Sequence, residues 1–462
     1  MNSLNLKSTP VYVTLTIGFT LIFAVFSIIF LKDFDYVISA QRLLALSAMS
    51  ALPILPVGLY FGLKRRVEFT TLLFILTASC VMLAIRMACL DFVSPDYRDF
   101  LQSWTGQMRA ASGVQALTQD IGDYNMPYLY VLTIIAKMPL HTLYPIKFFS
   151  IYFDFILAYY VMQISSLFFK SFTKQLAVFF AVLMLPTVIV NSAFWAQCDV
   201  VYAALAVASV YYGLTKRSAL CMIMMALAFS FKLQTIFVLP FLIVLLMAGR
   251  INWKHLLYFP ATFIATLLPA IAVGKPVLDT VSIYFEQTGQ YPRLTLNAPS
   301  LYASIYQHFL GFSFKLFDKT AVCIAGTAVF IVLYYCWLKR KSLDTSALLL
   351  IAFLFALMVP FLLPRMHERY FYMADILSIG AFFVCRKRIF VPFVMVYVSF
   401  RACSAFIFAD RGVNFHWLVI MLVVLLTVTI SDILKIVSKN EKEAVQVEKQ
   451  HESQSAGTAV KL

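Results

Sequence analysis

The stretch TTLLFILTASCVMLAIRMACL, residues Thr70–Leu90, runs directly into DFVSPDYRDFLQSW, residues Asp91–Trp104. The first part is almost wholly apolar and has the roughly 20 residues that a helix needs to cross a bilayer. The second part opens a segment with five aspartates and two arginines between Asp91 and Asp123. This contrast predicts a membrane-spanning helix that leads into a cluster of carboxylates at one face of the membrane.

The composition extends this interpretation to the whole chain. Of its 462 residues, 62% are hydrophobic and 13% are charged, and the mean hydropathy is +0.85. An ordinary soluble domain carries about 25% charged residues. The apolar residues form long runs rather than the alternating pattern of a transmembrane β-barrel. The predicted fold class is therefore an all-α polytopic integral membrane protein.

Charge and cysteine content argue against other classes. The net charge of +15 comes from basic residues in short turns between apolar runs, which is the positive-inside pattern rather than a nucleic-acid-binding surface. The eight cysteines contain no CxxC pair, so neither a zinc site nor a disulfide framework is indicated. The first apolar run, Val11–Leu31, lacks a small-residue cleavage site and is interpreted as a retained span.

The apolar runs predict a transmembrane domain over residues 1–437 with about 12–14 helices. Outer loops at 91–127 and 274–320 interrupt it, and the first should carry amphipathic helices. Residues 438–462 are polar and are predicted to form a disordered cytoplasmic tail. The predicted spans are Val11–Leu31, Leu43–Leu63, Thr70–Leu90, Lys147–Phe169, Gln175–Val190, Cys198–Leu214, Ala219–Phe231, Leu233–Gly249, His255–Val273, Ala321–Leu338, Thr345–Leu363, Tyr370–Cys385, Ile389–Phe408 and Phe415–Ile436.

Basic turns predict the orientation, because cytoplasmic turns carry an excess of Lys and Arg. With both termini inside, all the basic turns are cytoplasmic, provided that Tyr128–Pro145 is an interfacial, re-entrant or hairpin segment and not a single crossing. A second arrangement makes Ala219–Gly249 one long span around Lys232. The basic turns are Lys64-Arg65-Arg66, Lys170 with Lys174, Lys216-Arg217, Arg250 with Lys254, Lys339-Arg340-Lys341 and Arg386-Lys387-Arg388.

The motif SPDYRDFLQSW, Ser94–Trp104, is a candidate catalytic platform. Asp96 and Asp99 share one face if the segment is helical, and Pro95 suits the first turn of such a helix. A carboxylate held near a hydroxyl can act as a general base, although a solvated loop would also account for any single aspartate. Asp96 and Asp99 are the predicted catalytic residues.

Aromatic and amide side chains that suit a hydroxylated ligand follow in GDYNMPYLY (Gly122–Tyr130) and FWAQCDVVYAAL (Phe194–Leu205). The tyrosines could equally form an interfacial belt, and Asp199 could cap the helix that it begins. The predicted substrate-binding residues are Tyr97, Tyr124, Asn125, Gln197, Asp199 and Gln234.

Cationic residues predict a phosphate site. The motif LLPRMHERYFYMAD, Leu362–Asp375, concentrates two arginines, a histidine and Glu368 within five residues, and such a set can hold a phosphate by charge-assisted bonds. Lys232 either extends to the membrane interface or binds an anionic head group. A solvated turn is the alternative for the motif. The predicted donor-phosphate-binding residues are Arg365, Arg369, His367 and Lys232.

Two further expectations concern buried charge and metals. Asp154, inside an apolar run, is either a functional carboxylate or the partner of a cation such as Arg86 on a neighbouring helix. One histidine and one glutamate in Leu362–Asp375 do not make a recognisable metal-ligand spacing. We therefore expect no metal and no cofactor.

Four of these motifs, in this order, resemble bacterial mannosyltransferase-like membrane proteins related to GPI mannosyltransferase II, which belong to the GT-C class of glycosyltransferases. The resemblance runs from Asp91 to Asp375 and rests on SPDYRDFLQSW…GDYNMPYLYVL, FWAQCDVVYAAL, LAFSFKLQTIFVLPFL and LLPRMHERYFYMAD. It implies a GT-C-type helical bundle in a cell membrane, expected to be bacterial, with the active site on the extracytoplasmic face. It also implies Asp96 as the base, with Asp99 second. Where the family typically has NYNPPYLY, this chain has DYNMPYLY, so the geometry of this loop is left open.

The expected function is sugar transfer by inverting displacement from a polyprenyl-phosphate donor to a hydroxyl of a glycan or lipid-linked acceptor, and the resemblance suggests mannose. The chain has no glycine-rich nucleotide-binding loop, which fits a lipid-linked donor. The alternatives are a transporter or flippase of a lipid-linked saccharide, or a non-catalytic subunit of a membrane complex. Transporters commonly contain internal repeats and midplane sites, whereas this sequence has no repeat and its polar groups are predicted at one face.

Overall fold

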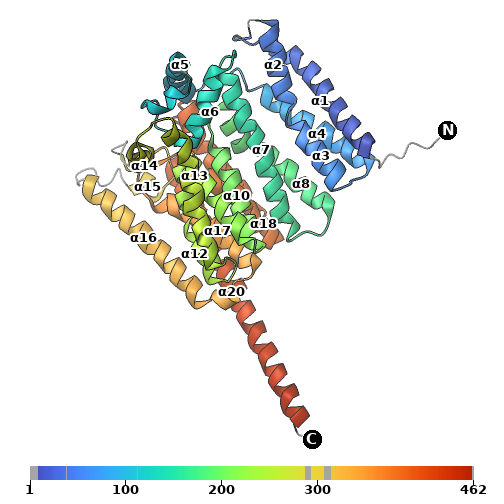
Figure 1. Cartoon of the computed structure of the whole chain (residues 1–462). Coiled ribbons are helices and arrows are strands. Elements are labelled where there is room, and N and C mark those ends of the chain that lie inside the picture. Colours follow the sequence, from blue (N-terminus) through green and yellow to red (C-terminus); the bar gives the residue numbers. More distant parts are fainter. Residues whose placement is uncertain (1–8, 38, 112, 287–292, 306–313, 460–462) are drawn as a thin grey trace, which may run out of the picture.

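The computed structural model of the chain describes residues 9–37, 39–111, 113–286, 293–305 and 314–459. Within these ranges it is a bundle of helices with one two-stranded parallel sheet (Figure 1). The predicted all-α fold class is confirmed. Residues 287–292 and 306–313 of the predicted second outer loop lie outside the described residues.

The helices follow the apolar runs of the sequence. In chain order they are α1 (Thr9–Leu31), α2 (Ala40–Ala51), α3 (Ile54–Leu59), α4 (Phe69–Met87), α5 (Gln102–Ala110), α6 (Met126–Lys137), α7 (Leu143–Ser166), α8 (Phe172–Leu183), α9 (Pro186–Ile189), α10 (Asp199–Leu214), α11 (Ser218–Phe231), α12 (Pro240–Met247), α13 (Tyr258–Ala272), α14 (Val277–Glu286), α15 (Leu301–Ile305), α16 (Phe314–Leu338), α17 (Thr345–Leu362), α18 (Tyr372–Val384), α19 (Phe390–Ile407) and α20 (Phe415–Ala459).

Shorter elements join these helices. The two strands are β1 (Thr295–Leu296) and β2 (Met366–His367). The π-helical turns are η1 (Tyr60–Lys64), η2 (Tyr97–Leu101) and η4 (Val190–Phe194). The 3-10 turns are η3 (Gly113–Thr118), η5 (Leu233–Phe237), η6 (Trp253–Leu257), η8 (Arg340–Ser342) and η9 (Arg386–Arg388).

The described helices make the chain a multi-pass integral membrane protein. Nine helical segments are long and apolar enough to cross a bilayer, and a tenth crossing results if α8 and the segment Pro186–Phe194, bent by 48°, form one broken span. Four shorter apolar helices, α6, α10, α11 and α18, complete the bundle. The predicted number of about 12–14 spans included α10, α11 and α18, which are shorter than the roughly 20 residues of a full crossing.

The basic turns gather at one end of the bundle. Arg65 donates to Oε1 of Gln175 at the start of α8 (2.9 Å), and the Arg386 guanidinium lies 3.9 Å from the centre of the Phe169 ring. These contacts connect three of the predicted cytoplasmic turns. The remaining contacts of this kind join Arg250 to Leu214 and Thr345, Lys339 to Glu441, and Arg388 to Asp432.

The segment between α4 and α7 begins and ends at the opposite end. The buried Lys147 ammonium, near the start of α7, donates to the carbonyls of Cys89, Leu90 and Phe92 just after α4, at 2.7–3.0 Å. The chain therefore returns to the end from which it left. Within this segment α6 has 12 residues, too few to cross a bilayer. The segment Tyr128–Pro145 thus makes no single crossing, as the predicted topology requires.

Helices α11 and α12 form a hairpin with Lys232 at its apex. α11 starts at the basic end, where Ser218 Oγ hydrogen-bonds Nδ1 of His255. After α12 the chain is back at this end, because Arg250 donates to the Leu214 carbonyl (3.2 Å). Lys232 itself has extended backbone angles (φ −154°, ψ 132°) that end α11. The prediction of two separate segments, Ala219–Phe231 and Leu233–Gly249, is therefore confirmed. The alternative, one long span around Lys232, is wrong.

A fully buried ion pair links α4, α7 and η4. Arg86 Nε lies 2.7 Å from Oδ2 of Asp154, and both side chains have no exposed surface. Ser192 Oγ donates to the same oxygen (2.6 Å), and Arg86 also donates to the Leu183 carbonyl (2.9 Å). Buried charges require such partners because an unpaired one is very costly in the membrane. Asp154 is therefore the partner of Arg86, as one of its two predicted roles states.

The tail differs from its prediction. Residues 438–462 were expected to be disordered, yet α20 continues as a helix to Ala459 and projects from the basic end of the bundle (Figure 1). Contacts with the turn after α16 support its start: Lys339 pairs with Glu441 (2.8 Å), and Asn440 Nδ2 donates to the Ser342 carbonyl (2.9 Å). Lys439 and Glu443 add a pair four residues apart. These bonds stabilise the start of the tail as a helix, although its polar composition predicted disorder.

The orientation can be tested by cysteine labelling of a chain whose native cysteines have been replaced. Ala110, at the end of α5, and Lys341, in a basic turn, are both exposed and lie at opposite ends. We expect Ala110→Cys to react with a membrane-impermeant maleimide in intact cells, and Lys341→Cys to react only after permeabilisation, because basic turns remain cytoplasmic. The reverse pattern would contradict the orientation.

Candidate functional site

A cavity of about 490 Å³ opens at the end of the bundle opposite the basic turns. It lies between the start of α5, the loop before α6, the apex of the α11–α12 hairpin and the two-stranded sheet. The charged, amide and hydroxyl-bearing residues that line it are Asp96, Asp99, Asp123, Tyr124, Asn125, Lys232, Gln234, Arg293, Thr295, Asn297, Arg365, His367, Glu368, Arg369 and Tyr370. Its volume is in the range of small-molecule sites.

Asp96 is held at the start of a helix. Helical structure begins at Pro95 and continues through η2 and α5 to Ala110, so the predicted helix start is confirmed. Ser94 Oγ accepts from the Tyr97 amide (3.2 Å) and donates to the Trp195 carbonyl (2.5 Å). One hydroxyl therefore both caps this helix and fixes it to the loop before α10.

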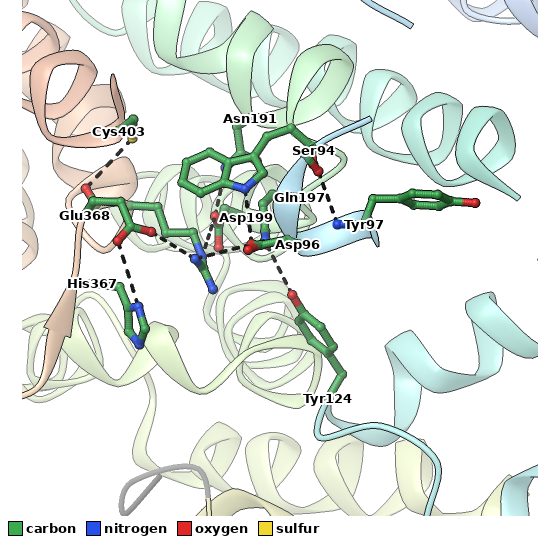
Figure 2. Close-up of polar contacts among 12 residues, drawn as sticks. Ser94, Asp96, Tyr97, Tyr124, Asn191, Gln197, Asp199, His367, Glu368 and Cys403 are labelled. Carbon is green, nitrogen blue, oxygen red and sulfur yellow. Dashed lines mark hydrogen bonds and ion pairs between the residues drawn. The ribbon is translucent and has the colours of Figure 1, made fainter. Parts of the chain in front are cut away.

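That loop supplies two donors to Asp96. Trp195 Nε1 donates to Oδ2 of Asp96 (3.1 Å), and Gln197 Nε2 donates to the same oxygen. Ala196, between the two donors, has a positive φ of 65°, which is uncommon for a residue with a side chain. In Figure 2, Gln197 and Asp199 lie beside Asp96. Among the described residues, all of the contacts to Asp96 are made by Oδ2.

Arg369 lies among three carboxylates. Its Nη1 is 3.0 Å from Oε1 of Glu368 and 3.6 Å from Oδ2 of Asp96, and its Nε is 3.8 Å from Oδ2 of Asp199. The guanidinium carbon lies 5.6 Å from the centre of the Trp195 ring, as a cation–π contact. Arg369 thus joins acidic residues from three segments that are far apart in the sequence.

Lys232 forms the second cationic contact of the cluster. Its ammonium pairs with Oδ1 of Asp199 and lies 5.5 Å from the centre of the Tyr124 ring. Asn191 Nδ2 donates to Oδ2 of Asp199 (2.8 Å). Tyr124 in turn donates to Oε1 of Gln197 (3.2 Å). Asp199 is therefore an ion-pair partner of Lys232 and Arg369 behind the cavity wall, and its predicted role in substrate binding stays a prediction.

Burial changes the pKa of two neighbouring groups. It raises the pKa of Glu368 to about 7, although the Arg369 charge acts in the opposite direction. Burial, together with the charges of Arg369 and Lys232, lowers the pKa of His367 to about 3. His367 is therefore neutral in this structure, and its predicted place in the phosphate site stays a prediction in which it acts as an uncharged hydrogen-bonding group.

Arg365 occupies a different environment from Arg369. Its Nε and Nη2 form a two-bond pair with Asp318 of α16 (2.8 and 2.7 Å), and its amide donates to the Leu294 carbonyl (2.8 Å). Residues four apart share one face only in a helix, but Arg365 has a positive φ of 62° and is followed by β2. Pairing of β2 with β1 overrides the helical pattern. Both side chains nevertheless line the cavity.

Tyr97 is a correction to the predicted substrate-binding set. Its side chain is buried and its hydroxyl hydrogen-bonds Oγ1 of Thr142 (2.9 Å). It follows Asp96 in the helix, so it points to a different side. Asn125 and Gln234 do line the cavity, whereas Gln197 and Asp199 reach it only through Asp96, Lys232 and Arg369. Asp99 lies at the rim, 51% exposed and paired with Arg98.

Among the site residues that were absent from the predicted set, four bear on its charges. They are Trp195 and Asn191, which hold the carboxylates, Glu368, which pairs with Arg369, and Arg293, which lines the cavity beside β1. Glu368 and Trp195 lie inside motifs that the sequence analysis examined. Their place in these motifs was the feature of the sequence that could have identified them as site residues. Within the described ranges, no group of three or more His, Cys, Asp and Glu residues is placed to hold a metal ion.

The helical multi-pass fold and the cavity of acidic and basic residues at one end of the bundle define a membrane protein with a candidate active site. A family model for glycosyltransferase family 87 matches residues 123–360, more than half of the chain. The protein belongs to glycosyltransferase family 87. The match favours a transferase over a transporter or flippase. No curated protein matches the chain.

The matched region includes part of the site only. It contains Tyr124, Asn125, Gln197, Asp199 and Lys232. Asp96 precedes it, and the Arg365–Arg369 segment follows it. The roles of these flanking residues rest on the geometry of this chain.

The raised pKa of Glu368 makes stability depend on pH. Its ordinary value is 4.5 and its value in the fold is about 7, so between these values the native state binds more protons than the unfolded chain. Stability therefore falls as pH rises through this window. We expect the thermal unfolding midpoint of the solubilised protein to drop between pH 5 and pH 7.5, and Glu368→Gln to flatten this drop, with Glu441→Gln as the control. An unchanged slope in Glu368→Gln would contradict the assignment.

Proposed function

We propose that this protein transfers a sugar from a polyprenyl-phosphate donor to an acceptor hydroxyl at the extracytoplasmic face, with inversion at the anomeric carbon. The acceptor is a glycan or a lipid-linked molecule, and mannose is the first sugar to test. The observation that carries the proposal is the pairing of Asp96 and Arg369 at the wall of one cavity, at the end of the bundle away from the basic turns.

Asp96 has the geometry of a general base. Two donors and Arg369 hold its Oδ2, which leaves Oδ1 to accept the proton of the acceptor hydroxyl. As the proton moves to Oδ1, the hydroxyl oxygen forms a bond to the anomeric carbon. The bond between that carbon and the phosphate oxygen breaks, and its electron pair leaves with the phosphate. Fixing a carboxylate in this way lowers the cost of orienting it for the reaction.

Cations at the cavity wall stabilise the phosphate as it leaves. Contacts with three carboxylates hold the Arg369 guanidinium in place, and Asp199 holds the Lys232 ammonium. The positions of both positive charges are therefore fixed before the reaction. Preorganised charge of this kind is usually the largest single catalytic contribution. Arg365 and Arg293 line the same cavity and extend the cationic surface. His367 contributes a neutral hydrogen-bonding group only.

A lipid-linked donor fits the surroundings of the cavity. Phe100, Leu101, Phe231 and Phe406 form part of its wall, and the bundle around it is membrane-embedded. The sequence has no glycine-rich phosphate loop that would bind a sugar nucleotide. These features support a donor whose polyprenyl chain remains in the bilayer while its phosphate and sugar enter the cavity.

The role of Asp96 is tested by Asp96→Asn in purified protein with labelled polyprenyl-phosphate sugars. We expect turnover to fall by about 10²–10⁴-fold, with donor binding retained, because the amide cannot accept the proton. The matched control is Asp99→Asn, since Asp99 lies three residues away at the rim and pairs only with Arg98 among the described residues. Near-native turnover in Asp96→Asn would contradict the mechanism, and loss only in Asp99→Asn would move the base there.

The two arginines should respond differently to lysine. Arg369 contacts three carboxylates through two nitrogens, a geometry that a lysine cannot reproduce. We expect Arg369→Lys to lower kcat by about 10²–10³-fold. Arg365→Lys should chiefly raise the donor KM, because Arg365 is already paired with Asp318 and lies beside the cavity. Equal and full activity in both variants would show that neither arginine binds the leaving phosphate.

A further inference from the structure

Behind Arg369 lies a second, very small cavity of about 10 Å³. It is separate from the large cavity and lies between η4, α9, α18 and α19. Its lining combines apolar groups with polar side chains that belong to the membrane-embedded core. The lining residues are Thr187, Val190, Asn191, Trp195, Arg369, Tyr372, Asp375, Ser399 and Cys403.

Polar atoms without a hydrogen-bond partner converge on this small cavity. Among the described residues, five buried side-chain atoms that lack a hydrogen bond belong to residues that line it: Arg369 Nε, Tyr372 OH, Asp375 Oδ2, Asn191 Oδ1 and Thr187 Oγ1. Buried polar groups nearly always have a partner, which can be an ordered water. Five such atoms around one cavity therefore indicate a shared ligand.

The size and polarity of the cavity identify that ligand as one water molecule. A water needs about 10–15 Å³ of such space and two to four polar partners. Arg369 Nε–H and the Tyr372 hydroxyl are donors, and Asp375 Oδ2 and Asn191 Oδ1 are acceptors. The Asn191 amide is oriented by its donation to Asp199 from Nδ2, so its oxygen is the atom left for the cavity. A water that accepts two bonds and donates two matches these four atoms, and the fifth, the Thr187 hydroxyl, interacts with the carboxylate of Asp375.

We propose that a single buried water binds here and connects the inner edge of Arg369 to Asp375 on α18. Asp375 is in turn fixed by Ser399 of α19, which donates to its Oδ1 (2.6 Å). The water thus extends the network of Arg369 to α18, which does not line the large cavity, and through Asp375 to α19. Tyr372 and Asp375 act as positioning residues: they hold Nε so that Nη1 faces Asp96 and Glu368.

The water site follows from the fold alone, while its effect on turnover rests on the proposed function. The first measurement is a high-resolution structure of the full chain in lipid nanodiscs. We expect one water within hydrogen-bond distance of Arg369 Nε and Asp375 Oδ2. A direct contact between these two side chains, or a cavity filled by protein atoms, would overturn the proposal.

The second measurement compares steady-state transfer by three variants with that of the parent. Tyr372→Phe removes one donor without changing shape and should lower kcat about tenfold, the effect of one hydrogen bond to a charged network, with donor KM within about twofold. Asp375→Asn keeps an oxygen acceptor and should retain most of the turnover. Tyr152→Phe, which removes a hydroxyl bonded to the Met49 carbonyl far from the site, is the control.

The outcomes separate the two proposals. Native kcat in Tyr372→Phe, with Asp96→Asn inactive, would reject the positioning role and leave the transferase mechanism standing. A water present in the structure, with Asp96→Asn fully active, would reject the mechanism and leave the water site standing. Loss of folding in Asp375→Asn would leave Tyr372→Phe as the deciding variant, because its hydroxyl is the only group removed.

Discussion

The cavity depends on one guanidinium held among three carboxylates. Arg369 comes from the turn between β2 and α18, Asp96 from the start of the α5 segment, and Asp199 from the start of α10. Each of these charges would be costly if it were left alone in a largely buried place. Their mutual pairing therefore offsets the free-energy cost of burying these charges. It also requires that three segments far apart in the sequence meet. The same pairing leaves carboxylate and cation adjacent at a cavity wall, which is the arrangement that the proposed proton transfer and phosphate departure need together.

Irregular backbone makes this pairing possible. A spanning helix satisfies its own backbone hydrogen bonds, so departures from helix in a membrane protein occur where protein or a polar cavity compensates for them. Around the site, the π-helical turns η2 and η4, the positive φ values of Ala196 and Arg365 and the extended Lys232 are such departures. Lys232, Arg365 and residues of η2 line the cavity, whereas η4 and Ala196 place the groups that bond the carboxylates of Asp199 and Asp96. The two-stranded sheet has a related effect, because it brings the loop after α14 against the Arg365–Arg369 segment.

Buried charges elsewhere in the bundle also need partners, and they find them in other ways. Arg86 and Asp154 pair with each other and take further bonds from a hydroxyl and a carbonyl. Lys147 has three backbone carbonyls as acceptors, and so fixes the short segment between α4 and the helix that carries Asp96. Neither group lines the large cavity. Their contribution is to hold rigid the elements on which the site is built, and a rigid frame is what a preorganised site requires.

The sequence alone determined the features that depend on local composition. Long apolar runs predicted the spans, the basic turns predicted which ends lie together, and Pro95 predicted a helix start. The isolated charge of Asp154 left two roles open, one of which was pairing with a cation such as Arg86. These follow from hydrophobicity and the cost of unpaired charge, which act whatever the surrounding fold. Only the tertiary structure decided that Tyr97 points away from the cavity, that Arg365 pairs with Asp318 rather than sharing a face with Arg369, and that burial leaves His367 neutral. It also brought in Trp195 and Glu368 as partners of Asp96 and Arg369. Those outcomes depend on which distant segments meet and how deeply each group is buried, and neither quantity is encoded in a short stretch of residues.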